Sequence, residues 1–295
     1  MPDAPHQANL MLRTIKRHPA LAYFVLTFAI SWGGILWVVG PGNVLASKEE
    51  FESFRWVPPL VLGPTIAGLL TTWLVAGKQG LRDYRSRLLR WRVGARWYAV
   101  ALLAAPIYYA TTALALSGFS REYLPAIVTA DDKAALLVQS MVVALSAGIF
   151  EELGWTGFAV PTLRRRYGSL ATGLIVGIVW GVWHILPETL GATAYGLLPY
   201  LAVQLVAVIV GLTGFRILMV WIYDRTGSVL IGILMHAGLT ASLLLLQPLV
   251  TGMSLMTVGL ILDAVPWLIV AIVVVGPSLV HPRQTTRPAH ESLGA

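Results

Sequence analysis

Eight long apolar runs constrain this chain more than any other feature. A helix needs about 20 mostly apolar residues to cross a bilayer, and the runs have this length. Because the hydrocarbon core offers no partner to backbone polar groups, each run is expected to be a helix that satisfies its own backbone. The sequence therefore predicts an all-α, polytopic membrane protein with about eight transmembrane helices. They are expected at Ala20–Val39, Val57–Ala76, Trp97–Leu116, Leu136–Val160, Leu170–Leu186, Leu198–Ile222, Val229–Leu246 and Leu255–Val275.

Composition agrees with an integral membrane protein. Charged residues make up 12% of the 295 residues, whereas a soluble domain carries about 25%. The chain has no cysteine, which excludes disulfides, thiolate zinc sites and a cysteine nucleophile. We expect three parts: an N-terminal segment (1–19), a transmembrane domain (20–276) and a disordered tail (277–295).

The basic residues predict the orientation, since Lys and Arg are retained in cytoplasmic loops. With eight spans, every strongly basic segment falls on one side, so both termini are expected in the cytoplasm. The expected location is the plasma membrane of a bacterium. Although the net charge is +7, this placement indicates contacts with lipid headgroups, so lipids and not nucleic acid are the expected partners. The basic positions are Arg13, Lys16, Arg17, Lys78, Arg82, Arg85, Arg87, Arg90, Arg92, Arg96, Arg164, Arg165, Arg166, Arg225, Arg283 and Arg287.

The segment from Gly80 to Tyr98 mixes arginines with Tyr84, Trp91 and Trp97. This pattern is typical of an amphipathic helix that lies in the membrane interface. We therefore predict one interfacial helix over this segment, which anchors the bundle to the cytoplasmic leaflet.

Two adjacent carboxylates, Glu151 and Glu152, interrupt the fourth apolar run. A charge at the bilayer centre costs at least about 2.5–3.5 kcal/mol, so such residues usually face a partner or a water-filled cavity. Two histidines, His184 and His236, lie within later apolar runs. With a rise of about 1.5 Å per residue, all of them fall within a few helical turns of the membrane centre. We interpret the four residues as one site.

Helical spacing suggests how the site could work. Neighbouring residues point about 100° apart, so Glu151 and Glu152 are expected to face different partners. Residues four apart share a face, which sets Trp180 beside His184 and Thr240 beside His236. A carboxylate and a histidine can activate water as general bases, and His236 with Thr240 could stabilise an oxyanion. Glu151, His184 and His236 would equally suit a catalytic zinc ion, and the sequence leaves both mechanisms open.

Other interpretations compete with this one. The glutamate pair could be structural, bonded to the backbone or to Arg216, and the histidines could be satisfied core residues. Trp155, Trp180 and Trp183 could shape a groove for lipid or peptide around the site. Asp263 is a further carboxylate in an apolar run, with no assigned role. The HExxH and GxGD motifs of other intramembrane proteases are absent.

Three motifs, each on a predicted helix, carry a family resemblance. They are Glu151-Glu152-Leu153-Gly154-Trp155-Thr156, Trp180-Gly181-Val182-Trp183-His184 and His236-Ala237-Gly238-Leu239-Thr240. In this order the chain resembles the CAAX protease and bacteriocin-processing (CPBP or Abi) family, whose motifs run EExxxR, FxxxH and HxxxN or HxxxD over an eight-helix core. The resemblance covers most of residues 20–247.

The resemblance implies an intramembrane, glutamate-dependent or metal-dependent endopeptidase acting on a membrane-associated or lipidated peptide. It implies Glu151 and His184 as the water-activating pair, His236 as part of the oxyanion or metal site, and Glu152 as an orienting residue. Two departures stand out. Thr156 replaces the motif arginine, so an ion pair with a motif glutamate is expected to be missing, and Thr240 replaces the asparagine.

These departures keep two other functions open. One is a non-proteolytic membrane protein that uses the same scaffold for immunity or partner binding. The other is a membrane enzyme that performs acid–base chemistry on a lipid or prenyl substrate.

Overall fold

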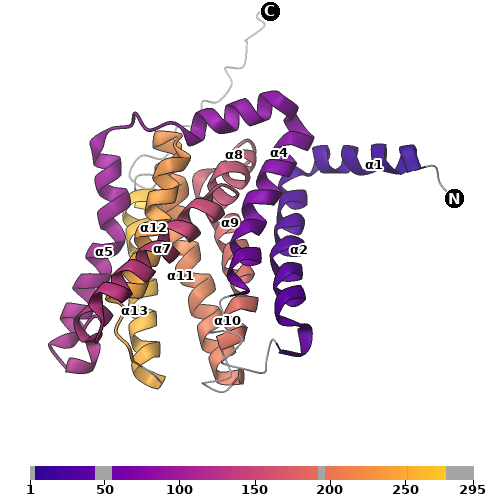
Figure 1. Cartoon of the computed structure of the whole chain (residues 1–295). Helices are drawn as coiled ribbons and strands as arrows, with labels where there is room; N and C mark the ends of the chain where they lie inside the picture. Colours follow the sequence, from indigo (N-terminus) through magenta and orange to yellow (C-terminus); the bar gives the residue numbers. More distant parts are fainter. Residues whose placement is uncertain (1–3, 44–54, 192–196, 251, 277–295) are drawn as a thin grey trace, which may run out of the picture.

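The protein is a bundle of helices, seen here in a computed structural model that describes residues 4–43, 55–191, 197–250 and 252–276. These residues contain no β-strand, which confirms the all-α prediction. Figure 1 shows the long helices side by side, with α1 projecting from one end of the bundle. The elements are α1 (Ala4–Arg17), α2 (Pro19–Val39), η1 (Pro41–Asn43), α4 (Val57–Leu88), α5 (Ala95–Ser117), η2 (Arg121–Tyr123), α6 (Ala126–Thr129), α7 (Lys133–Glu152), η3 (Trp155–Ala159), α8 (Val160–Leu163), α9 (Ser169–Trp183), α10 (Ile185–Gly191), α11 (Leu197–Thr226), α12 (Val229–Leu246), α13 (Gly252–Val270) and η5 (Ala271–Val275).

Seven helical segments among the described residues are long and apolar enough to cross a membrane, so the protein is polytopic as predicted. The remaining predicted span, Leu198–Ile222, falls on the 30-residue α11, part of which lies outside the residues whose side chains are described. The total of eight therefore stays a prediction. The expected tail, 277–295, also lies outside the described residues.

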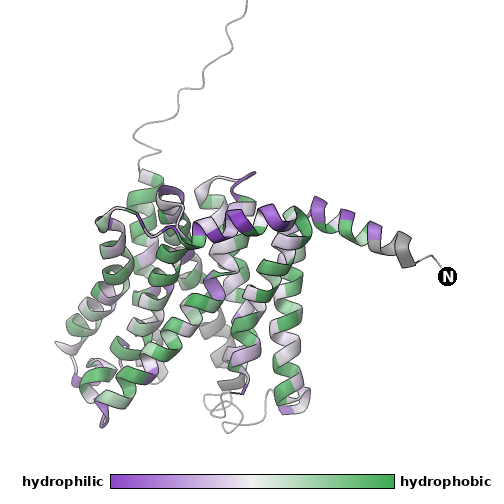
Figure 2. Ribbon diagram, turned by 45° about the horizontal axis from the view of Figure 1, so that its top comes forward, coloured by the Kyte–Doolittle hydropathy of each residue, from purple (hydrophilic) through white to green (hydrophobic). Residues whose placement is uncertain are grey.

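Basic segments gather at one end of the bundle. Figure 2 shows hydrophilic residues along α1 and along the second half of α4, which both lie at this end. Lys16 and Arg17 at the end of α1 line a common pocket with Arg165 and Arg166, which follow α8. The grouping matches the single basic side expected from the sequence, and which side of the membrane it faces stays a prediction.

The predicted interfacial helix over Gly80–Tyr98 is wrong in its extent. Helix α4 continues past the predicted span to Leu88, through a non-helical Gly77 with φ 57° and ψ −147°. Residues 89–94 are not helical, and Trp97 and Tyr98 belong to α5. Leu89, with φ −85° and ψ 9°, leaves the helical conformation and ends α4, and Gly94, with φ −57° and ψ 139°, is the extended residue from which α5 starts.

The predicted span Leu136–Val160 lies within one membrane-length helical segment, Lys133–Leu163, but its regular α-helix is interrupted directly after the glutamates. Helix α7 ends at Glu152 and a π-helical turn, η3, follows. Such a break inside a membrane requires other partners for the freed carbonyl groups. Side chains of α4 provide them: Thr65 donates to the carbonyl of Phe150, Tyr84 to that of Leu153 at 2.6 Å, and Arg87 to that of Gly157 at 3.1 Å.

The predicted span Leu170–Leu186 breaks in the same way. Helix α9 ends at Trp183, and His184 caps it before α10 begins. The carbonyl of Trp183 accepts a hydrogen bond from Nε1 of Trp32 on α2, at 3.0 Å. Both breaks therefore lie beside residues predicted to form the site.

A stripe of glycines sets the position of α9 against α11. Gly173, Gly177 and Gly181 recur every four residues, a spacing that lets membrane helices approach closely. A Cβ added at Gly177 would lie 2.6 Å from the Cα of Thr213 on α11, and the other two glycines face α11 equally tightly. This close packing fixes the height of Trp180 and His184 relative to Arg216 of α11.

We predict that Gly177→Val lowers the free energy of unfolding by about 1–3 kcal/mol, because the added side chain overpacks this interface. Chemical unfolding in detergent micelles measures the change. Gly33→Val is the matched control, since nothing lies within 4 Å of a Cβ added at Gly33 on α2. Equal losses of stability for the two variants would contradict the packing argument.

Candidate functional site

The centre of the bundle holds an ion pair shielded from solvent. Nη1 of Arg216 lies 2.7 Å from Oε2 of Glu152, and Nη2 lies 2.8 Å from Oε1. Both side chains are fully buried. The two parallel hydrogen bonds are the strong geometry for an arginine and a carboxylate. Breaking such a buried pair is strongly destabilising.

Two further groups donate to the same carboxylate. Nδ1 of His236 lies 2.8 Å from Oε1 of Glu152, and the hydroxyl of Thr156 donates to Oε2. Glu152 at the end of α7 therefore ties together α11, α12 and η3. Because Nδ1 of His236 donates to a carboxylate, its other ring nitrogen, Nε2, is left for a different contact.

The expected loss of an ion pair at the glutamate motif is therefore wrong. Thr156 does occupy the position of the motif arginine, but Arg216 supplies the guanidinium from α11. Sequence reasoning had considered Arg216 only as a partner in a purely structural pair. The signal for its importance was present, since a lone arginine within an apolar run must find a partner.

Glu151 points elsewhere, as expected for a helical neighbour. Its Oε2 accepts a hydrogen bond from Nε1 of Trp180, at 2.8 Å. Glu151 is buried from bulk solvent, yet it lines a partly open cavity of about 250 Å³. The two glutamates thus differ in surroundings, one held by an arginine and the other open to a cavity.

Trp180 connects most of the site. Its ring lies over the guanidinium of Arg216, 4.1 Å from ring centre to Cζ, and meets the His236 ring edge-on with centroids 5.0 Å apart. Its carbonyl lies 2.9 Å from Nδ1 of His184. Since a carbonyl only accepts, Nδ1 of His184 carries the proton and Nε2 is free to accept one.

The cavity brings together the predicted residues, with the exception of Glu152. Glu151, His184, His236 and Thr240 all line it. No hydrogen bond joins Glu151 directly to either imidazole in the part of the chain that the structure describes, so a molecule in the cavity would have to bridge them. Its other lining residues include Tyr108, Tyr109, Trp180, Gly211, Phe215, Leu239, Leu262, Asp263 and Pro266.

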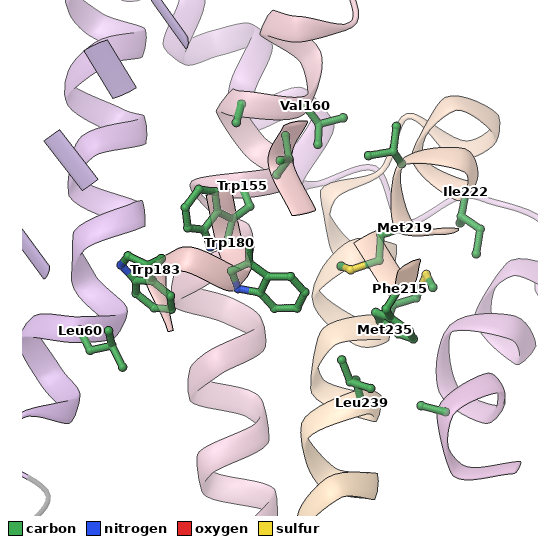
Figure 3. Close-up of a cluster of buried hydrophobic side chains, with 14 of the residues drawn as sticks. Leu60, Trp155, Val160, Trp180, Trp183, Phe215, Met219, Ile222, Met235 and Leu239 are labelled. Carbon is green, nitrogen blue, oxygen red and sulfur yellow. The ribbon is translucent and has the colours of Figure 1, made fainter. Parts of the chain in front are cut away.

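The proposed groove of three tryptophans is wrong for two of them. Trp155 and Trp183 are fully buried and pack edge-on against each other, with centroids 5.9 Å apart. Figure 3 shows the rings of Trp183 and Trp180 pointing to opposite sides. Only Trp180 of the three lines the cavity, so the others serve the core.

The geometry does not favour the zinc alternative. Within the described ranges no group of three or more His, Cys, Asp or Glu side chains is arranged to hold a metal ion. Glu151, His184 and His236 all line the cavity, but they do not form such a group.

Two comparisons bear on identity. A family model described as Type II CAAX prenyl endopeptidase Rce1-like matches residues 133–242. The "CAAX prenyl protease 2" of Methanococcus maripaludis is 24% identical over 190 residues, which cover 59% of this chain and 64% of that protein. The match thus spans less than two thirds of the relative's length. The family model covers all five predicted site residues, and the resemblance to the CAAX protease family drawn from the motifs is confirmed.

The ion pair generates a prediction of stability. Arg216→Met should lower the free energy of unfolding by about 3–5 kcal/mol, because Glu152 would be left as an uncompensated buried charge. Unfolding by denaturant in detergent micelles measures this loss.

The double variant Glu152→Gln with Arg216→Met is the matched comparison. It removes both charges, so we expect it to be more stable than Arg216→Met alone, in a double-mutant cycle. If Arg216→Met were as stable as the wild type, the central role of the pair would be wrong.

Proposed function

We propose that this chain, with helices α7 to α12 similar to those of CAAX prenyl endopeptidases, is an intramembrane endopeptidase. Its substrate would be a membrane-associated or lipidated peptide. The observation that carries the proposal is a cavity among membrane-spanning helices that is lined by Glu151, His184, His236 and Thr240. Ionisable residues at such a depth are expensive and usually functional.

Water activation is assigned to Glu151 and His184. Trp180 supports both, because its Nε1 holds Oε2 of Glu151 and its carbonyl fixes the tautomer of His184. A water molecule between them would give a proton to Glu151 as its oxygen attacks the peptide carbonyl carbon. Nε2 of His184 would accept a hydrogen bond from the same water molecule. It would then help to pass the proton from Glu151 to the nitrogen of the leaving amine. The C–N bond then breaks, leaving a carboxylic acid and an amine.

Stabilisation of the developing oxyanion is assigned to His236 and Thr240, which lie one turn apart on α12. The hydroxyl of Thr240 can donate directly. His236 would donate through Nε2 when doubly protonated, and its Nδ1 bond to Glu152, at 2.8 Å, holds the ring in place. Fixed donors of this kind stabilise charge that forms only in the transition state.

A peptide attached to the membrane suits the surroundings of the cavity. The helices around it expose many apolar side chains, such as Val138 and Val142 of α7 and Leu260 of α13, and these face lipid in a membrane. A lipid anchor would therefore deliver the peptide to the right depth. The similar protein of Methanococcus maripaludis is named a CAAX prenyl protease, which agrees with a prenylated peptide.

The first test is Glu151→Gln. We expect loss of turnover on a prenylated peptide, by at least about a hundredfold, since a general base contributes typically about 10²–10⁴-fold. Folded yield and thermal stability should be retained, because Glu151 takes no part in the buried ion pair. Turnover is measured by mass spectrometry of the cleaved peptide.

Three outcomes would redirect the proposal. Retained activity in Glu151→Gln would remove the base assignment. If binding to a partner persisted in both Glu151→Gln and His184→Ala while no peptide was cleaved by the wild type, a non-proteolytic role would replace the protease. Turnover of a prenyl lipid without a peptide would instead favour acid–base chemistry on lipids.

A second test separates orientation from simple presence of the base. Trp180→Phe keeps the aromatic ring but removes the N–H group that holds Glu151. We expect kcat to fall roughly ten- to hundredfold, because small misplacements of a catalytic group are costly, with KM changed far less. Unchanged kcat would show that Trp180 does not orient Glu151.

A further inference from the structure

Asp263 is an ionisable residue in the cavity that the proposed reaction does not use. It lies on α13 between apolar neighbours, and its oxygens accept no hydrogen bond within the described ranges. Its side chain lines the same cavity as Glu151 and the two histidines. A carboxylate in an apolar helix usually faces a partner or a water-filled space, and here it faces the cavity.

The surrounding helices leave room for this carboxylate. A Cβ added at Gly211 of α11 would overlap Oδ1 of Asp263, so glycine at this position lets the side chain lie flat against α11. Tyr108 and Tyr109 of α5 line the same cavity and lie within electrostatic range of Asp263. The carboxylate of Asp263 thus lies against Gly211 of α11 in the lining of the cavity.

The charges of the cavity favour a cation. Its lining includes two carboxylates, Glu151 and Asp263, and neither lysine nor arginine among the described residues. The nearby guanidinium of Arg216 is already paired with Glu152. The imidazole of His236, which donates to the oxyanion in the proposed mechanism, is held by Glu152. The carboxylate of Asp263 has no cationic partner among the described residues, so it would attract a positively charged group of a ligand.

We propose that Asp263 binds a cationic group of the substrate, an ammonium or guanidinium on a residue next to the scissile bond. This inference rests on the proposed function and adds a specificity-determining residue to it. The cavity volume of about 250 Å³ is below the roughly 300–1,000 Å³ of pockets that enclose drug-sized ligands. It therefore suits one side chain better than a whole lipid chain.

The test compares two lipidated peptides that differ only beside the scissile bond, one with lysine and one with norleucine, its uncharged analogue. We expect the wild type to prefer lysine by about tenfold or more in kcat/KM, the scale of a hydrogen bond to a charged group. In Asp263→Asn the ratio of the two values should fall to about one, and Asp263→Glu should restore part of it.

The ratio separates recognition from a structural role. If Asp263 only stabilised the fold, Asp263→Asn would lower kcat/KM for the lysine and norleucine peptides by the same factor. The ratio of the two would then be unchanged, and this result would overturn the inference. A wild-type ratio near one would also overturn it while leaving the protease function intact. Asp224→Asn is the matched control, because Asp224 lies in an ion pair with Arg164, at 2.7 Å, outside the cavity, and the lysine preference should persist.

A binding measurement decides the inference even if no peptide is cleaved. n-Hexylamine and n-hexanol differ in the charged group, and a ligand that binds the folded state raises Tm. We expect hexylamine to raise the Tm of the wild type more than hexanol does, and this difference to vanish in Asp263→Asn. Equal shifts in the wild type would refute cation binding, whereas failure of every peptide would refute only the protease function.

Discussion

The buried ion pair between Glu152 and Arg216 is the interaction on which the rest of the site depends. It joins α7 to α11, and the hydrogen bond from His236 adds α12. Removing two charges from water is costly, and such a pair persists only where hydrogen bonds satisfy both groups. Here Glu152 accepts four hydrogen bonds, from Arg216, His236 and Thr156. The position of His236 at the cavity is thus a consequence of how Glu152 is neutralised.

The two helix breaks serve the same site. Helix α7 stops at Glu152 and α9 stops at Trp183, and in each case side chains from α2 or α4 capture carbonyls that the break releases. A continuous α9 would bond the carbonyl of Trp180 to the backbone N–H of residue 184. In the structure the N–H of His184 donates to Gly181 instead, and the carbonyl of Trp180 is left for the imidazole. Irregular backbone therefore sets the tautomer of a proposed catalytic histidine.

The sequence could predict the class of fold and that Glu151, His184 and His236 gather around one cavity, because apolar length and buried charge are local signals. Glu151, Glu152, His184 and His236 stood out since each interrupts an apolar run. The pairing of Glu152 with Arg216 was one alternative among several, and the sequence could not select it because it depends on the register between α9, α11 and α7. That register follows from close approaches such as Gly177 against Thr213, which a single sequence does not display. The breaks were missed for the same reason, since apolar periodicity continues through them.

Packing around Thr156 explains why the arginine comes from another helix. Thr156 is almost fully buried, and a Cβ added at Gly232 of α12 would lie 3.1 Å from its side chain. The space at position 156 is therefore filled by a small residue held against α12, and a guanidinium there would have to displace that helix. Arg216 reaches the same carboxylate from α11. The guanidinium of Arg216 then lies over the ring of Trp180. The arginine that neutralises Glu152 therefore also holds in place the indole that donates to Glu151.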